Sequence, residues 1–495
     1  MITLVKQFIY LIVLSVCFAN FNSAQTIRTT AMGGLTYSIK DKDYSINAYD
    51  LAANPAWLIN DEINDYLEIT PSISSKWGDY RRKYDPEKSN FYGLLFEGVK
   101  VLDSTGTFLG QTTYEYDYRS NVYRSLKYNT YNGEAFFMND TTVGNFRYNG
   151  PSMRFMYSFK PINDFFVGAT AKYKILDGLK SIYSRAQTLY RSIAGDVGLA
   201  YNISPAFTAG IKFAFNDEQE KIEAASEDLL DVEIYNFKGE TFSVRNRSGS
   251  VNQKIHNLSK SISAQLFIKP SNNTEAALLG NVERRSEEIL IPYTSSATNE
   301  RFQEYEDGYA SFNVYDFKII IRHNFSEEFM LSGKASYNEN NSWSKNSPID
   351  LLLWKWNVKD INAGVGSSYY IANDFLLGAE YELSFIKIDS AKYADSRYNV
   401  IKATTHAAKI GTEYMIFENT FLRLGYNFEV FDESENSLGE STVTYHKVTA
   451  GTGIKIFDTF SIDAQLEYQQ ASKEVNTVLK RSSLSGVITL TLFSF

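Results

Sequence analysis

The stretch that decides the fold is Phe375-Leu-Leu-Gly-Ala-Glu-Tyr-Glu-Leu-Ser-Phe385, in which apolar residues alternate with small or polar ones. A period of two along such a stretch predicts a β-strand with one apolar and one polar face. The same alternation recurs at Phe165–Tyr173, Phe207–Phe215, Phe329–Tyr337, Leu422–Val430 and Phe460–Tyr468. Segments of about 9–11 residues match tilted strands that cross a bilayer, whereas soluble strands average about 5–6 residues. The pattern therefore predicts an all-β fold that spans a membrane.

The connections between these strands are of two kinds. Short polar turns fall at 160–164, 202–205, 269–273, 324–326, 372–374, 418–420 and 457–459, and long charged loops fall at 216–259, 281–314, 338–360 and 432–442. Short turns at one end and long loops at the other are typical of outer-membrane barrels. Together with an opening strand at Tyr66–Trp77 and a final strand at Leu484–Phe495, they predict a single antiparallel transmembrane β-barrel of about 14–16 strands. The pairing of residues 78–150 stays open.

The first 24 residues predict a secretory signal peptide. Lys6 precedes the apolar run 8–18, and Ser23-Ala24 ends the leader, so that Gln25 begins the mature chain. The apolar run is shorter than the roughly 20 residues of a membrane-spanning helix. In an alternative interpretation, the chain is a lipoprotein that is acylated at Cys17. The bulky Val16 before the cysteine disfavours this alternative. Export and a barrel together predict the outer membrane of a Gram-negative bacterium.

Composition excludes several classes of function. A net charge of −9 and a pI near 5.3 disfavour nucleic-acid binding. Because the one cysteine, Cys17, lies in the leader, the mature chain is expected to have no disulfide, thiol nucleophile or cysteine-ligated metal. The sequence predicts no cofactor and no metal site.

The C-terminal strand ends on Phe495. A terminal strand that ends on an aromatic residue resembles the signal read by the barrel-assembly machinery. Phe495 is therefore the predicted assembly signal, and this machinery and outer-membrane lipid are the expected partners.

The segment after the leader resembles the start of FadL-type barrels, a family that includes long-chain fatty-acid and aromatic-hydrocarbon transporters and PorV-like secretion subunits. The resemblance lies in Arg28-Thr-Thr-Ala-Met-Gly-Gly-Leu35, the acidic spacer at Asp41 and Asp43, and Asn54-Pro55-Ala56-Trp57-Leu58. It implies an N-terminal hatch inside the barrel, over residues 25–62, followed by the barrel itself at 63–495. The implied hatch residues are Gly33, Gly34, Asn54, Pro55 and Ala56. Trp57 stands where the family usually has glycine, so the backbone there is expected to differ.

The polar faces of the predicted strands carry many charges. If they face the lumen, they form either a polar conduit or ordinary hydrated barrel filling. They are Lys172, Lys212, Lys334, Glu380, Glu382, Arg423, Glu429, Asp463 and Glu467. The acidic loop 217–240, interrupted by Leu229 and Leu230, predicts either a solvated loop or a short amphipathic helix.

Catalytic motifs are weak. His256, His323, His406 and His446 have no metal-ligand spacing. By alternation His406 and Ser384 could share the inner face, which suggests a Ser–His hydrolase. Barrel lipases place such residues on the outer surface instead, and no nucleophile-elbow motif is present. The sequence therefore predicts a barrel without enzymatic activity.

The expected function is passive uptake of a small hydrophobic molecule across the outer membrane. The alternative is a non-transporting role, as a PorV-like secretion-system subunit or as a surface interaction protein. Both rest on the family resemblance, because a fold alone does not fix function.

Overall fold

A computed structural model of the chain describes residues 53–59, 65–103, 106–130, 134–239, 242–247, 249–293, 303–372, 374–393, 396–417, 419–434, 442–456, 459–474 and 478–493. The predicted signal peptide, most of the predicted hatch with Gly33 and Gly34, and the predicted assembly signal Phe495 lie outside these residues.

The described residues form twenty strands and three short 3₁₀ helices. They are η4 (Pro55–Ile59), β1 (Tyr66–Gly78), β2 (Lys88–Asp103), β3 (Gly106–Ser125), β4 (Phe136–Ile162), β5 (Phe165–Lys180), β6 (Gln187–Ser204), β7 (Phe207–Ser226), η5 (Asp228–Leu230), β8 (Ile234–Lys238), β9 (Phe242–Asn246), β10 (Gly249–Ser271), β11 (Thr274–Tyr293), β12 (Gln303–Asn324), β13 (Phe329–Asn346), η6 (Ser347–Ile349), β14 (Leu351–Ala372), β15 (Phe375–Lys392), β16 (Arg397–Phe417), β17 (Thr420–Ser434), β18 (Val443–Ile456), β19 (Phe460–Glu474) and β20 (Val478–Phe493). No helix among the described residues is long and apolar enough to cross a membrane.

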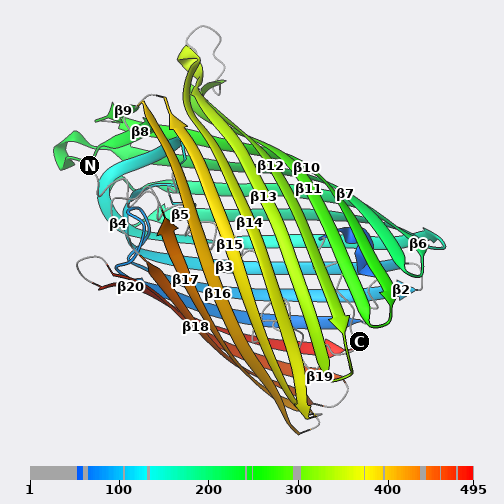
Figure 1. Ribbon diagram of the computed structural model, residues 1–495. Coiled ribbons are helices and arrows are strands. Elements are labelled where there is room, and N and C mark those ends of the chain that lie inside the picture. The colour runs from blue at the N-terminus through cyan, green and yellow to red at the C-terminus, as the bar shows by residue number, and fades with distance from the viewer. Residues whose placement is uncertain are drawn as a thin grey trace.

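Eighteen of the strands close into one antiparallel barrel (Figure 1). Neighbours in sequence pair throughout, except that β7 pairs with β10, and β20 closes the barrel on β1 with Tyr66 opposite Phe493. The hairpin β8–β9 is not one of the ring strands and pairs with the beginning of β4. The all-β fold, with a single antiparallel barrel, predicted from the alternation is confirmed.

The predicted number of strands was too low. The missing hairpin is β2–β3, in the segment 78–150 whose pairing the sequence left open. Its outer face reads Tyr92, Leu94 and Phe96, but Phe91 and Leu95 also occur between them, so the period of two is lost. A chain that is apolar on both faces gives no alternation to detect.

The strands are also longer than a bilayer requires. On the outer face of β7, Phe207, Phe213 and Phe215 are exposed, and Asp217 and Gln219 follow them. The apolar belt therefore ends near Phe215, about ten residues above the short turn, as expected for a spanning strand. Much of each predicted long loop is thus strand that continues above the belt, where the outer face of β7 becomes polar.

The segment 217–240 is one such case, and its described residues, 217–239, form no α-helix. It begins as the upper part of β7, makes the single turn η5, and continues into β8. Leu229, in η5, is 94% exposed, so this turn buries no apolar face.

Candidate functional site

The helix η4 lies inside the barrel, near the end that carries the short turns. It contacts β3, β4, β5 and β6 and is visible as a short blue turn within the barrel (Figure 1). Pro55, Ala56, Trp57 and Leu58 are all buried. Proline suits the first turn of a helix, because its missing N–H would have no partner there. The five residues that most resemble the FadL-type motif are therefore the ones that dock on the inner wall.

Asn54 fixes the start of this segment. Its side-chain amide donates to Gln265 Oε1 at 2.7 Å and to the backbone oxygen of Ile211 at 3.2 Å, while its Oδ1 accepts from the Ala56 N–H at 3.0 Å. The Asn54 backbone oxygen accepts from the Trp57 N–H at 3.1 Å. One side chain thus caps the helix and joins it to β7 and β10.

Trp57 makes the second attachment. Its indole N–H donates to the same Gln265 Oε1 at 3.0 Å, and its ring packs edge-on against Phe267 with 4.7 Å between the centroids. Gln265 is buried on the inner face of β10. Tryptophan in place of the usual glycine therefore adds a wall contact, because a side chain fills the space between η4 and β10.

Glycines on the wall make room for the segment. A Cβ at Gly168 would lie 2.4 Å from the Pro55 carbonyl carbon and 2.6 Å from the Ala56 nitrogen. A Cβ at Gly198, which is directly opposite Gly168 in register, would lie 1.8 Å from Asn54 Oδ1. Any other residue at Gly168 would meet backbone, which cannot swing aside as a side chain can.

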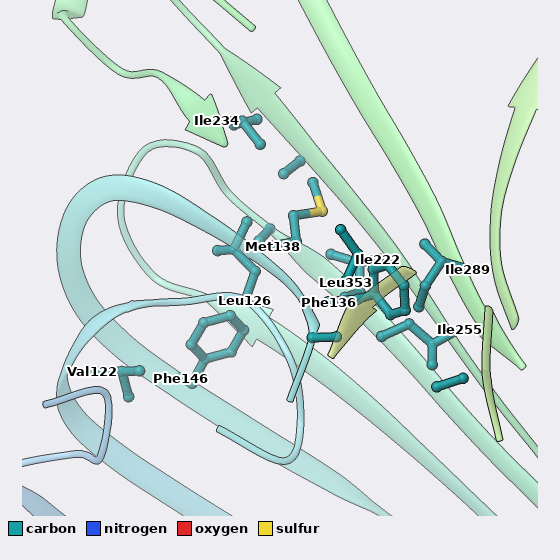
Figure 2. Close-up of a cluster of buried hydrophobic side chains, with 14 of the residues drawn as sticks. Val122, Leu126, Phe136, Met138, Phe146, Ile222, Ile234, Ile255, Ile289 and Leu353 are labelled. Atoms are coloured by element: carbon teal, nitrogen blue, oxygen red, sulfur yellow. The ribbon is translucent and has the colours of Figure 1, made fainter. Parts of the chain in front are cut away.

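A second segment enters the lumen at the other end. We call residues 126–130, 134–140, 234–239 and 242–246 the cap; they belong to the β3–β4 connection, the start of β4 and the hairpin β8–β9. Figure 2 shows their buried apolar side chains, with Leu126, Phe136 and Met138 packed toward Ile222, Ile255 and Ile289 of the wall. Leu353 and Trp354 of β14 belong to the same cluster. Because β4 and β14 are eight strands apart in the ring, the cap crosses most of the lumen.

Two buried ion pairs attach the cap to two different parts of the wall, at β5 and at β12. Asp140 and Lys180 of β5 pair at 2.7 Å, and Lys238 and Asp307 of β12 pair at 2.5 Å. Lys238 also donates to Asn346 at 3.1 Å. Buried ion pairs of this kind hold the cap in one position, because removing one partner leaves the other charge buried without a counter-ion.

The β1–β2 connection packs beside the cap. Tyr80 is buried against Ala403, Phe431, Val443 and Ala471 of β16–β19. Tyr84 approaches Phe137 of the cap with 5.8 Å between ring centroids. The long-loop end is therefore covered from two sides.

Between η4 and the cap the lumen is lined by ion pairs. Lys172 pairs with Asp196 at 2.9 Å, and the Lys212 ammonium lies 3.4 Å from the Ala53 backbone oxygen. Farther round the ring, the charges form two clusters. In the first cluster, Lys334 pairs with Glu382 at 2.8 Å, and Lys409 lies 3.6 Å from Glu380. In the second, Arg423 lies between Glu413, at 2.5 Å, and Asp463, at 3.4 Å. Lys447 of β18 and Glu467 of β19 pair at 2.7 Å. Glu429 lies on β17, on the same face as Arg423.

One acid of the upper lumen faces the cap directly. Glu220, on the part of β7 above the apolar belt, accepts the Tyr128 N–H at 2.5 Å. Burial raises the pKa of Glu220 to about 7, although Lys127 nearby opposes the shift. This carboxyl therefore titrates near neutral pH while in contact with the cap.

The proposed sharing of an inner face by Ser384 and His406 was wrong. His406 points outward and bonds to the Tyr381 hydroxyl with 2.7 Å between Oη and Nδ1, whereas Ser384 points inward and donates to Asp360 at 3.0 Å. Lys409, Glu413 and Arg423 fill the inner face of β16 and β17 in this region.

Gln265 and Gly168 have no signal in the sequence that marks them as site residues. Each is an ordinary member of the polar face of its strand, and only the docked η4 gives it a role. The cap residues were missed because segment 126–140 carries no strand period.

Comparisons with known proteins show the fold. The ferric citrate transporter FecA, in its unliganded form, is 10% identical with a TM-score of 0.50, over 83% of this chain and 60% of that one. The chain thus spans 60% of the length of FecA. The toluene transporter TbuX of Ralstonia pickettii is 11% identical over 96% of this chain and 100% of that one (TM-score 0.36), and the monoaromatic hydrocarbon channel CymD is 11% identical over 94% and 96% (TM-score 0.36). None of the curated proteins matches.

A family of unknown function, DUF6850, matches residues 55–341, a range that starts at Pro55 of η4 and ends in β13. Because this match covers more than half of the chain, the protein belongs to that family.

Proposed function

We propose that this chain is an outer-membrane barrel that admits a small molecule passively, through a lumen that is occupied at rest by η4 and by the cap. The observation that carries the proposal is the way η4 packs against the inner wall of the barrel. A pair of facing glycines, Gly168 and Gly198, leaves room for backbone where a wall would normally carry side chains. A segment held by hydrogen bonds and a fitted surface, rather than by a continuous strand, can leave without breaking the barrel.

The proposed substrate is a small, mainly hydrophobic molecule. From the long-loop end it would meet the cap, whose interior residues such as Phe136 and Met138 are apolar. Beyond the cap the lumen is lined by ion pairs. A purely apolar solute makes few favourable contacts there. A solute with a polar group can instead form hydrogen bonds with the charged side chains in place of the water it displaces. A substrate with one polar group therefore fits both regions better than a bare hydrocarbon.

A non-transporting role as a secretion-system subunit or surface interaction protein is the second candidate. The cap supports it, because Asp140–Lys180 and Lys238–Asp307 tie the cap to two walls. A barrel filled in this way would serve as a rigid platform for its loops.

Two measurements distinguish transport from the non-transporting role: conductance in planar bilayers, and uptake of toluene and oleate into proteoliposomes. The informative variant is Gly168→Ala, whose Cβ would collide with Pro55 and Ala56. The matched control is Gly280→Ala on β11, where a Cβ would meet nothing within 4 Å. Transport predicts more frequent openings and faster uptake in Gly168→Ala, with the control like the natural protein. Folded barrels that stay closed and take up neither probe in all three forms would contradict transport and favour the second candidate.

A further inference from the structure

A pocket opens on the outer wall of the barrel, over the upper parts of β4, β5, β6 and β7. Its volume is about 510 Å³, which lies within the roughly 300–1,000 Å³ that small-molecule sites span. We call it the outer pocket. The polar side chains that line it are Arg147, Asn149, Asp177, Gln187, Lys221 and Glu223.

The outer pocket faces away from the lumen. Ile222, between Lys221 and Glu223, is fully buried on the inner face, and Leu176, beside Asp177, is buried as well. Successive side chains of a strand alternate between the two faces of a sheet. The three charged side chains therefore point outward, on the opposite side of the wall from the cap.

A break in the strand ladder lies directly below the pocket. The pairing of β4 with β5 is interrupted at Gly150 and Pro151, next to Asn149. Proline has no N–H to donate to the ladder. A Cβ at Gly150 would lie only 2.0 Å from the Ile175 backbone oxygen, so glycine allows the two backbones to approach closely here. The outer wall is therefore irregular at the place where the pocket begins.

The pocket lies immediately above the apolar belt. On β5 the outward side chains from Phe165 to Ile175 are uncharged, and Asp177 is the first charged one. This stretch has the length of a bilayer-spanning strand. Long loops face the outside of the cell in outer-membrane barrels. The pocket is thus at the height of the headgroups of the outer leaflet.

The charges of the pocket balance one another. Arg147, Asp177, Lys221 and Glu223 are two cations and two anions, so no excess charge calls for an ion. Among the residues that the structure describes, none of these four charged groups has an ion pair or a hydrogen bond. Their donors and acceptors are therefore available to a ligand of mixed hydrogen-bonding character.

A sugar has this mixed character. Each hydroxyl of a sugar both donates and accepts, so it can donate to a carboxylate and accept from a guanidinium or an ammonium group. Leu179 and Leu189 complete the lining, and Leu189 is 37% exposed. These leucines offer an apolar surface to the C–H groups of a sugar ring. An inorganic anion would use only the two cations, and a hydrocarbon would use only the two leucines.

We propose that the outer pocket binds the sugar of a glycolipid in the outer leaflet, with the acyl chains of that lipid lying on the belt below. Met153 of β4 and Tyr173 of β5 are directly opposite each other there, and both are exposed. The height of the pocket favours a lipid-borne sugar over a soluble one, because the lipid brings its sugar to this level of the wall. The proposal requires that the barrel span the membrane and is independent of whether it transports.

The test uses the full chain purified in a polyoxyethylene detergent, because maltoside and glucoside detergents carry sugars themselves. Three probes are added separately: lipooligosaccharide, the lipid A obtained from it by mild acid hydrolysis, and the core oligosaccharide released in the same step. Binding is measured by native mass spectrometry over a range of probe concentrations.

The variant is Asp177→Ala/Lys221→Ala, which removes one acid and one base and leaves the net charge unchanged. The matched control is Glu327→Ala/Lys355→Ala, which makes the same change at exposed side chains outside the pocket. Should the double variant fail to fold, Gln187→Ala alone is expected to weaken binding several-fold.

We expect lipooligosaccharide to bind the natural chain and the control equally and the variant about 10-fold more weakly, as for the loss of two hydrogen-bonding groups. Lipid A, which lacks the sugars, should bind all three forms equally. Equal binding of lipooligosaccharide by all three forms would overturn the proposal.

Two further outcomes would reject the ligand assignment. Core oligosaccharide that binds as tightly as lipooligosaccharide would assign the pocket to a soluble saccharide and overturn the lipid source. Binding that is lost in about 0.5 M NaCl, which screens exposed charges, would show an ionic contact and overturn the sugar assignment.

Discussion

Asp140 and Lys180 form an ion pair in which neither side chain has any exposed surface, with 2.7 Å between Oδ2 and Nζ. Lys180 also donates to the Thr142 backbone oxygen at 3.1 Å and to its hydroxyl at 2.9 Å, and Ser184 donates to Asp140 at 2.5 Å. Asp140 is the last residue of β4 that pairs with β8. The pair therefore holds the cap hairpin to β5.

Replacing Asp140 with alanine should destabilise the barrel strongly. Lys180 would stay buried without its counter-ion, which typically costs about 3–5 kcal/mol. The free energy of unfolding in urea measures this loss. Asp350→Ala is the control, because Asp350 is 81% exposed in its pair with Lys345 and its loss should cost about 0–1 kcal/mol. Equal costs for the two variants would contradict a structural role for the buried pair.

Gln265→Leu should release η4 without unfolding the barrel. Asn54 and Trp57 both donate to Gln265 Oε1, and a buried donor that loses its partner costs about 1–3 kcal/mol. Hydrogen exchange at residues 53–59 should accelerate while the strands keep their protection. The control is Gln253→Leu on the same strand, since Gln253 Oε1 has no hydrogen-bond partner among the described residues. Unchanged hydrogen exchange at residues 53–59 in Gln265→Leu would mean that the packing of η4 against the wall holds it in place without these hydrogen bonds.

The sequence predicted the wall well and the lumen contents poorly. In Phe375–Phe385 the chemistry of each side chain depends only on whether it faces lipid or lumen, so a period of two is enough to assign it. Gln265 and Gly168 obey the same period, yet their function comes from a segment more than a hundred residues away. Only the fold brings them together. The cap has no period at all, because residues such as Leu126 and Phe136 pack against several walls instead of one face.

Asp307→Ala should loosen the end of the cap that is held by β12. Lys238 would lose its ion pair with β12 and keep, among the described residues, only its hydrogen bond to Asn346. Amides of β8 should then exchange faster, and the global stability should fall by a few kcal/mol. If the cap is a gate, conductance should rise in this variant. Faster exchange of β8 without any conductance would instead indicate that loosening the cap at this wall does not open the lumen.

The stability of the capped state relative to an uncapped state should fall as pH rises, because Glu220 loses its proton. Its pKa of about 7 in the capped barrel lies above the ordinary value near 4.5, so the capped state binds this proton more tightly than an uncapped state would. The stabilisation is complete below about pH 4.5 and is lost as pH rises through about 7, with a total on the order of 3 kcal/mol. Hydrogen exchange at 126–130 and 134–140, corrected for the intrinsic pH dependence of exchange, should therefore accelerate between pH 5 and 8. Glu220→Gln is neutral at every pH and should remain protected over this range. A pH profile shared by both forms would assign the titration to another group.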